Sequence, residues 1–225
     1  MEGDALLLAL PFTGRWLVRN SPARRVPSHG TDLLGSTYAI DFVGVDDQHR
    51  IAPRDWRTLL ATEPPERFPA FGRPILAPIT GVVVVAHDAE PDHEARRSQL
   101  ALVGYALGQA SRLRSGLPAI AGNHIVLAHA GGAHVSVVHL RAGSVLVSPG
   151  VAVVAGQQLA QCGNSGNSTQ PHVHVQATDS ADLDRARGLP IRFRAYREWE
   201  RGREPARDRK AGIPAEGAVI EPLGE

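Results

Sequence analysis

Two histidines in residues 168–176 (STQPHVHVQ) have a spacing that can bring two metal ligands together. Glycines and Pro171 precede them, so we expect a β-strand to begin at about His172. Residues two apart on a strand point to the same side, which pairs His172 with His174 and turns Val173 and Val175 toward the core. Two imidazoles side by side above an apolar sheet make half of a metal site. Taken alone, the pair is equally compatible with a structural role.

A third histidine and a carboxylate also lie in strand-like surroundings. His139 comes near the end of residues 135–140 (VSVVHL), on the predicted face of Val135 and Val137, where a histidine is more often a hydrogen-bonded core residue than a catalyst. Asp41 interrupts the apolar run YAIDFV. Burying an unpaired charge is costly, so Asp41 needs a partner, and a metal ion would be one.

Composition narrows the kind of metal site. The 225 residues include ten histidines and a single cysteine. One cysteine excludes an internal disulfide and a thiolate-rich zinc site, so a metal would need histidine and carboxylate ligands. The formal net charge of +1 gives no argument for binding nucleic acid or a membrane surface.

The N-terminal apolar run, residues 5–12, is too short to cross a bilayer. Glu2 and Asp4 precede it, where a signal peptide would have lysine or arginine. We therefore expect no signal peptide, no membrane span and a cytoplasmic protein. A trimmed or misassigned start would allow the cell envelope or secretion instead.

The elements that must position these side chains are mainly strands. Short Val/Ile/Leu runs separated by Gly, Pro and Asn predict an all-β fold, an antiparallel or sandwich-like sheet with the site in a groove over it. Residues 1–187 would form this domain, with a loop insertion at 46–71 and a helical insertion at 92–115. Residues 188–225 are rich in arginine and would form an extension that packs on the domain or trails from it.

From Gly72 to Ala177 the sequence resembles the lysostaphin- and LytM-type zinc metallopeptidases, a family of peptidoglycan endopeptidases. The similar segments are FGRPILAPITGVVVVA, GNHIVLAHAGG, VSVVHL and VSPGVAVVAGQQLAQCGNSGNSTQPHVHVQ. The last of these follows a family pattern that ends in P-H-L-H-F-E. The order and spacing of these motifs are highly specific.

The resemblance implies a role for each of five residues. His174 would be a zinc ligand, Asp41 the carboxylate ligand and His29 the first ligand, while His139 and His172 would be the catalytic histidines. The family pattern H-x-x-x-D is not kept, because His29 and Asp41 are twelve residues apart and Leu33 stands four after His29. Asp32 is therefore an alternative to Asp41.

Two histidines and one aspartate leave a fourth position open for water, as in catalytic zinc sites. We thus expect one zinc per chain, hydrolysis of peptidoglycan-type or other short Gly- or D-amino-acid-containing peptides, and activity that falls near neutrality as a histidine protonates. The alternatives are a non-catalytic LytM-like binding or regulatory module and an intracellular peptide-maturation protease. The sequence does not predict an oligomeric state.

Overall fold

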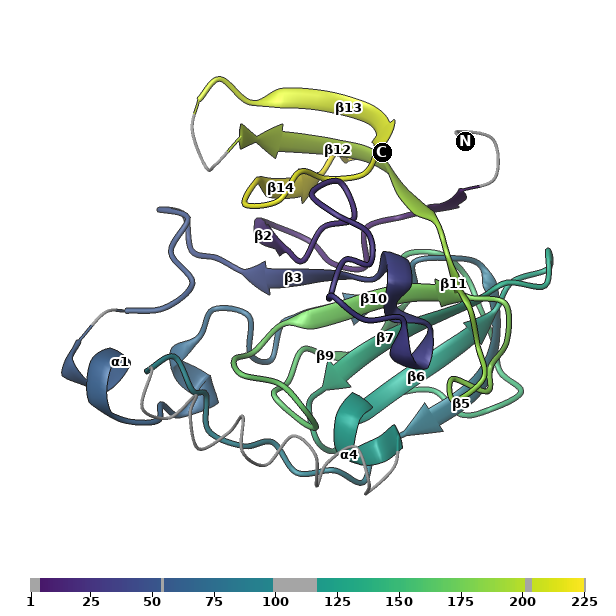
Figure 1. The fold of residues 1–225 in the computed structure, drawn as a ribbon, viewed down its shortest axis with the longest axis horizontal. Helices are drawn as coiled ribbons and strands as arrows, with labels where there is room; N and C mark the ends of the chain where they lie inside the picture. Colours follow the sequence, from purple (N-terminus) through teal and green to yellow (C-terminus); the bar gives the residue numbers. More distant parts are fainter. Residues whose placement is uncertain (1–4, 54, 99–116, 201–203, 225) are drawn as a thin grey trace.

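Short apolar runs bounded by glycine and proline form strands in the computed structural model, which describes residues 5–53, 55–98, 117–200 and 204–224 (Figure 1). Most of them join one twelve-stranded sheet. Its strands are β1 (Leu6–Leu8), β2 (Trp16–Arg19), β3 (Ile40–Gly44), β5 (Gly81–His87), β6 (Asn123–Ala128), β7 (His134–Leu140), β8 (Ala152–Val153), β10 (Val173–Thr178), β11 (Gly188–Leu189), β12 (Ile191–Trp199), β13 (Arg207–Gly212) and β14 (Val219–Pro222). A separate pair consists of β4 (Pro74–Leu76) and β9 (Gln158–Gln161).

The main path of the sheet runs β1-β12-β14-β2-β3-β10-β7-β6-β5-β8, while β11 pairs with β10 and β13 with β12. The expected all-β fold is confirmed. One pair departs from the antiparallel prediction, because β1 runs parallel to β12. These two strands lie at opposite ends of the sequence, so no hairpin turn fixes their relative direction.

Aromatic side chains hold the middle of the sheet to its N- and C-terminal strands. The rings of Phe12 and Trp16 stack with centroids 4.6 Å apart, and Phe42 on β3 packs edge-on against Phe193 on β12 at 5.3 Å. All four side chains are buried. Val173 and Val175 of β10 lie in the same core, as the alternation predicted. One continuous core therefore supports the strands that carry Asp41 and His174.

The insertion at 46–71 contains the short helix α1 (Trp56–Leu60) and the 3₁₀ turn η2 (Pro65–Arg67). Its Glu63 is fully buried and forms an ion pair with Arg97, with Glu63 Oε1 2.6 Å from Arg97 Nη2. The backbone of Glu63 also pairs with Ala95. This insertion is thereby fastened to residues 92–98.

The predicted helix at 92–115 does not begin where expected. Residues 92–98 are extended because their backbone pairs with Glu63 and with the chain around Asn164 and Thr169. Most of the remaining prediction falls on residues 99–116, outside the described residues. The helix α4 (Leu117–Ala121) follows the predicted range.

The C-terminal strands extend the sheet, since β14 pairs with both β12 and β2 (Figure 1). Two arginines of this C-terminal segment form ion pairs between β12 and β13: Arg197 pairs with Asp208, and Arg209 pairs with Glu198. How the chain divides into domains at residue 187 stays a prediction. Within the described ranges, no helix has the length and apolar character needed to span a membrane.

Candidate metal centre and active site

Three predicted ligands converge on one face of the sheet. His174 on β10 stands directly opposite Asp41 on β3, so the two side chains share a face. His174 Nδ1 lies 2.9 Å from Asp41 Oδ1, and His29 Nε2 lies 3.1 Å from Asp41 Oδ2. The three ligand atoms all lie within 4.8 Å of one another. Among the described residues, this is the one group of three or more histidine, cysteine or acidic residues that could hold a metal ion.

The segment between His29 and Asp41 folds back on itself, which explains how twelve residues can separate two neighbours. It contains the 3₁₀ turn η1 (Leu33–Tyr38), and Ser28 N donates a hydrogen bond to Thr37 O at 3.0 Å, closing the loop. Gly35 has a φ of +73° and a Cβ there would lie 2.5 Å from Thr178 Cγ2, so only glycine fits. The loop therefore presses against β10 and returns His29 to Asp41.

Asp32, the alternative carboxylate, lies outside this group. Its side chain is exposed, and Oδ1 accepts a hydrogen bond from the Thr37 hydroxyl at 2.9 Å. The geometry thus favours Asp41 over Asp32 as a ligand.

Asp41 is buried yet ionised. Burial alone would raise the pKa of this carboxyl, but the positive charge that His172 gains in acid and hydrogen bonds from His174 and His29 hold the pKa well below its ordinary value. Asn20 adds a fourth partner, donating from Nδ2 to Asp41 Oδ2 at 2.7 Å. Sequence reasoning missed Asn20, because the contact depends on the pairing of β2 with β3 and has no local signal.

His174 lies between two oxygen acceptors. Its Nδ1 faces Asp41, and its Nε2 lies 2.9 Å from Gln176 Oε1. The Gln176 amide is oriented by its own donation from Nε2 to Leu34 O at 2.8 Å. Burial lowers the pKa of His174, but the hydrogen bond to Asp41, the negative charge of Asp41 and the hydrogen bond to Gln176 together raise the pKa above its ordinary value. A cation at Nδ1 would take the place of the proton there.

The donor set fits zinc. Zinc binds histidine nitrogen and carboxylate oxygen at about 2.0–2.2 Å, so two ligand atoms of a tetrahedral site are about 3.3 Å apart. His174 Nδ1 lies 2.9 Å from Asp41 Oδ1 and His29 Nε2 lies 3.1 Å from Asp41 Oδ2, so each imidazole is close to that separation from one of the two carboxylate oxygens. Two imidazoles with one carboxylate are also a ligand set of catalytic zinc sites, which keep a position open.

A β-bulge aims His139 at this centre. Asn123 pairs with Leu140 and His124 with Val138, so His139 is an extra residue on β7, with a φ of +65°. The prediction that His139 shares a face with Val135 and Val137 is wrong. Those valines are in the core, whereas His139 and Val138 both line the cavity beside the candidate metal ligands, because the bulge reverses the alternation at that point.

His139 and His172 present the same nitrogen to the site. The Nδ1 atom of His139 donates to Ser165 O at 3.0 Å, and that of His172 donates to Gln170 O at 2.8 Å. A carbonyl oxygen accepts only, so Nδ1 keeps its proton and Nε2 retains its lone pair. Burial lowers the pKa of both imidazoles, of His139 well below the ordinary value, and both are neutral at neutral pH. Their rings lie 4.7 Å apart, and His172 Nε2 is 3.8 Å from Asp41 Oδ1.

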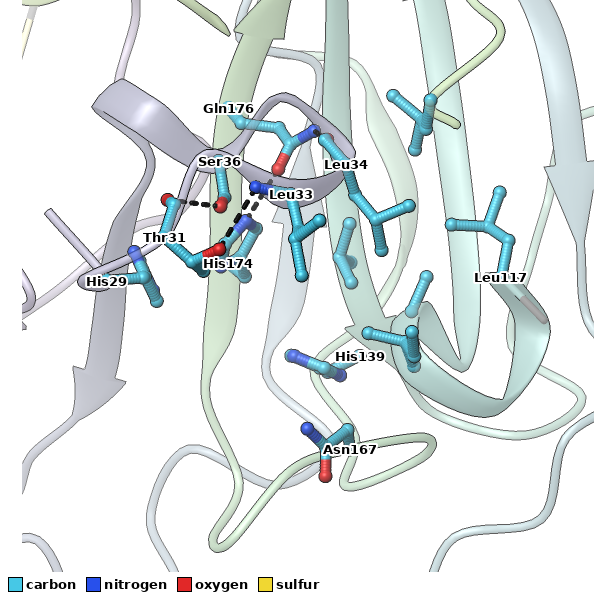
Figure 2. A pocket seen from close by; sticks show the side chains of 14 residues that line it. His29, Thr31, Leu33, Leu34, Ser36, Leu117, His139, Asn167, His174 and Gln176 are labelled. Atoms are coloured by element: carbon cyan, nitrogen blue, oxygen red, sulfur yellow. Dashed lines mark hydrogen bonds between the residues drawn. The ribbon is translucent and has the colours of Figure 1, made fainter. Parts of the chain in front are cut away.

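A cavity of about 400 Å³ opens beside these groups (Figure 2). His29, His174 and His139 face it from one side, and leucines of η1 and α4 face it from the others. Asp41 and His172 are not part of its lining. The structure thus brings the five predicted site residues together, three of them at the cavity wall.

The sequence comparison agrees with this geometry. Residues 67–184, which are 118 of the 225, match peptidase family M23. The matched range includes His139, His172 and His174 but begins after His29 and Asp41. The grouping of His29 and Asp41 with His174 therefore rests on the structure. No curated protein matches the sequence.

Several solved structures are similar. The catalytic domain of lysostaphin from Staphylococcus simulans is 18% identical with a TM-score of 0.40, over 78% of this chain and 88% of that one. The catalytic domain of the prophage-encoded M23 protein EnpA from Enterococcus faecalis is 18% identical with a TM-score of 0.39, over 68% and 73%. A zinc-containing peptidase from Vibrio cholerae is 20% identical with a TM-score of 0.34, over 67% and 48%. On the family match, the chain belongs to peptidase family M23 and is a metallopeptidase, a hydrolase of peptide bonds.

Proposed function

We propose that this protein is a zinc endopeptidase that holds one zinc ion per chain through His29, Asp41 and His174. The observation that carries the proposal is the convergence of these three side chains around an ionised, buried carboxylate. The substrate class is a peptidoglycan-type or other short peptide, in keeping with the family to which the chain belongs.

Zinc bound there would polarise the scissile carbonyl and acidify a water at the open position. The chain itself supplies the proton transfers. His139 and His172 each offer a neutral Nε2, so one of them can accept the proton of the attacking water and return it to the leaving amine. The Nε2 lone pair of the other can accept a hydrogen bond from the same water and so orient it.

A glutamate base is not evident at the site. The described cavity lining contains no glutamate. His93-Glu94 begins an H-E-x-x-H motif, but Arg97 occupies the second histidine position and its guanidinium binds Glu63. Glu94 itself hydrogen-bonds Thr62. Histidine must therefore perform the acid–base chemistry.

The zinc content of the purified protein tests the metal site. We expect about one zinc per chain in the wild type, and a large loss in Asp41→Ala and in His174→Ala, because removing one of three protein ligands cripples a tetrahedral site. His129→Ala is the matched control, since His129 lies in the turn at the far end of β6 and accepts a hydrogen bond from Gly131 N. Wild-type zinc in Asp41→Ala would move the carboxylate role to Asp32.

Peptide hydrolysis separates the enzyme from a non-catalytic LytM-like binding module. The complete set of converging ligands and neutral histidines favours the enzyme. Zinc-loaded protein that binds peptides without cleaving any would identify a binding module.

A further inference from the structure

The cavity beside the metal ligands has walls of bulky apolar side chains. They come from four parts of the chain and face the imidazoles of His29, His139 and His174 across the cavity (Figure 2). These apolar residues are Leu33 and Leu34 in η1, Leu117 and Ile120 in α4, Val138 in β7, and Leu183.

Hydrogen bonding and packing hold the cavity wall formed by η1 in place. Its Leu34 carbonyl accepts a hydrogen bond from Gln176, and Leu34 has a φ of +56°, a left-handed conformation that a leucine adopts only when its surroundings hold it there. Gly35 packs against Thr178 of β10. The insertion that separates His29 from Asp41 therefore does two things: it delivers a metal ligand and it supplies an apolar wall.

The opposite wall, α4, is tied to the catalytic histidine. Asn167 N donates to Ile120 O at 2.8 Å, which joins α4 to the glycine-rich turn. Ser165 in the same turn accepts the hydrogen bond of His139. The α4 wall is thus tied to His139 through this turn, and the η1 wall to His174 through Gln176. A side chain held between them would lie beside the proposed metal ligand and the proposed base.

We propose that this cavity binds a bulky apolar side chain, leucine or larger, on the substrate residue adjoining the scissile bond. The inference rests on the proposed peptidase function and refines it. A volume of about 400 Å³ falls within the range of about 300–1,000 Å³ typical of ligand pockets. Glycine would leave the apolar walls without contacts, so Gly–Gly bonds are poor substrates of this enzyme.

The test is a leucine scan in quenched fluorescent peptides. Zinc-loaded full-length protein is given pentaglycine and five peptides that each replace one glycine with leucine, and kcat/KM is measured for each. We expect a leucine at one position to raise kcat/KM at least about 10-fold, because a single methylene in an apolar pocket is worth about 10–200-fold. Pentaglycine cleaved as fast as every leucine peptide would overturn the proposal.

Variants locate the preference. Leu33→Ala and Leu117→Ala should each lower the leucine-to-glycine ratio of kcat/KM by about 5-fold or more, since they remove apolar contacts from opposite walls. Leu33 is 60% exposed, so this substitution leaves folding intact. The matched control is Leu60→Ala on α1, where the side chain is 66% exposed and outside the cavity; it should change neither rate. Equal ratios in all three variants would place the preference elsewhere and refute the assignment.

Binding measured on the same protein separates the two proposals. If no peptide is cleaved but at least one leucine peptide binds more tightly than pentaglycine, the peptidase proposal fails and the proposal for the apolar cavity stands. If peptides are cleaved without any preference for leucine, the peptidase proposal stands and the cavity proposal fails. A protein that shows no cleavage and no selective binding would refute both proposals.

Discussion

Replacing Gln176 by leucine should weaken zinc binding although Gln176 does not itself contact the metal. Gln176 is 4% exposed and accepts the hydrogen bond of His174 Nε2 at 2.9 Å. That acceptor keeps the proton on Nε2 and leaves Nδ1 for the metal. Gln176→Leu is close in size, but it leaves the Nε2–H of His174 and the carbonyl of Leu34 without their partner.

The expected size of the effect follows from these two hydrogen bonds. A buried polar group that loses its partner costs about 1–3 kcal/mol, and about 1.4 kcal/mol is a factor of ten. The zinc dissociation constant should therefore rise by about 10–100-fold, the range typical of residues that orient a metal ligand. Gln176→Glu keeps an acceptor for His174 and should retain tight binding; the family pattern has glutamate at this position.

Competition with a chromophoric zinc chelator measures the dissociation constant, and thermal unfolding of the metal-free protein is followed in parallel. Gln158→Leu, an exposed glutamine-to-leucine change on β9, is the control. A wild-type dissociation constant in Gln176→Leu, with only a lower melting temperature, would show that Gln176 supports the fold without orienting His174. The argument for the His174 tautomer would then be refuted.

Three further outcomes are expected. First, His139→Ala and His172→Ala should each keep stoichiometric zinc and lose about 100-fold or more in kcat; a zinc-free preparation of either variant would make that histidine a ligand. Second, because burial lowers the pKa of His139 and His172, their neutral, proton-accepting forms persist as the pH falls below the ordinary value of about 6.5. The rate should therefore decline only below pH 6.5, not near neutrality as the sequence suggested, and a half-maximal rate above that pH, with zinc still bound, would contradict the burial argument. Third, Arg97→Met should lower the free energy of unfolding by about 3 kcal/mol, because Glu63 stays buried after losing its closest partner. Urea unfolding measures this. An unchanged midpoint would mean that the more distant Arg67, whose Nε lies 3.6 Å from Glu63 Oε1, suffices alone.

The pairing of His172 with His174 could be predicted from the sequence because it depends on a local rule. Successive strand residues alternate between two faces, and the valines at 173 and 175 identify the buried one. The glycine- and proline-bounded apolar runs predicted most strands for the same reason. Asp41 could be singled out because a charge inside an apolar strand needs a partner.

Other features depend on contacts between distant segments. The helix predicted from residue 92 is replaced by an extended segment because Ala95 pairs with Glu63, a contact without a local signal. The hydrogen bond from Asn20 to Asp41 arises because β2 pairs with β3. The parallel pairing of β1 arises because the chain returns to it at β12, far along the sequence. Local propensity contains no information on such pairings.

The sequence by itself determined the strand framework and the family, and it predicted the histidines and the aspartate of the candidate site. The tertiary structure decided how those residues meet. The loop after His29 closes through Ser28 and Thr37, and the bulge on β7 turns His139 from the core to the cavity. Both features depend on backbone geometry that neighbouring strands set. A loop closure or a single extra residue in a strand redirects a side chain, and neither can be recognised from the amino-acid composition of the segment.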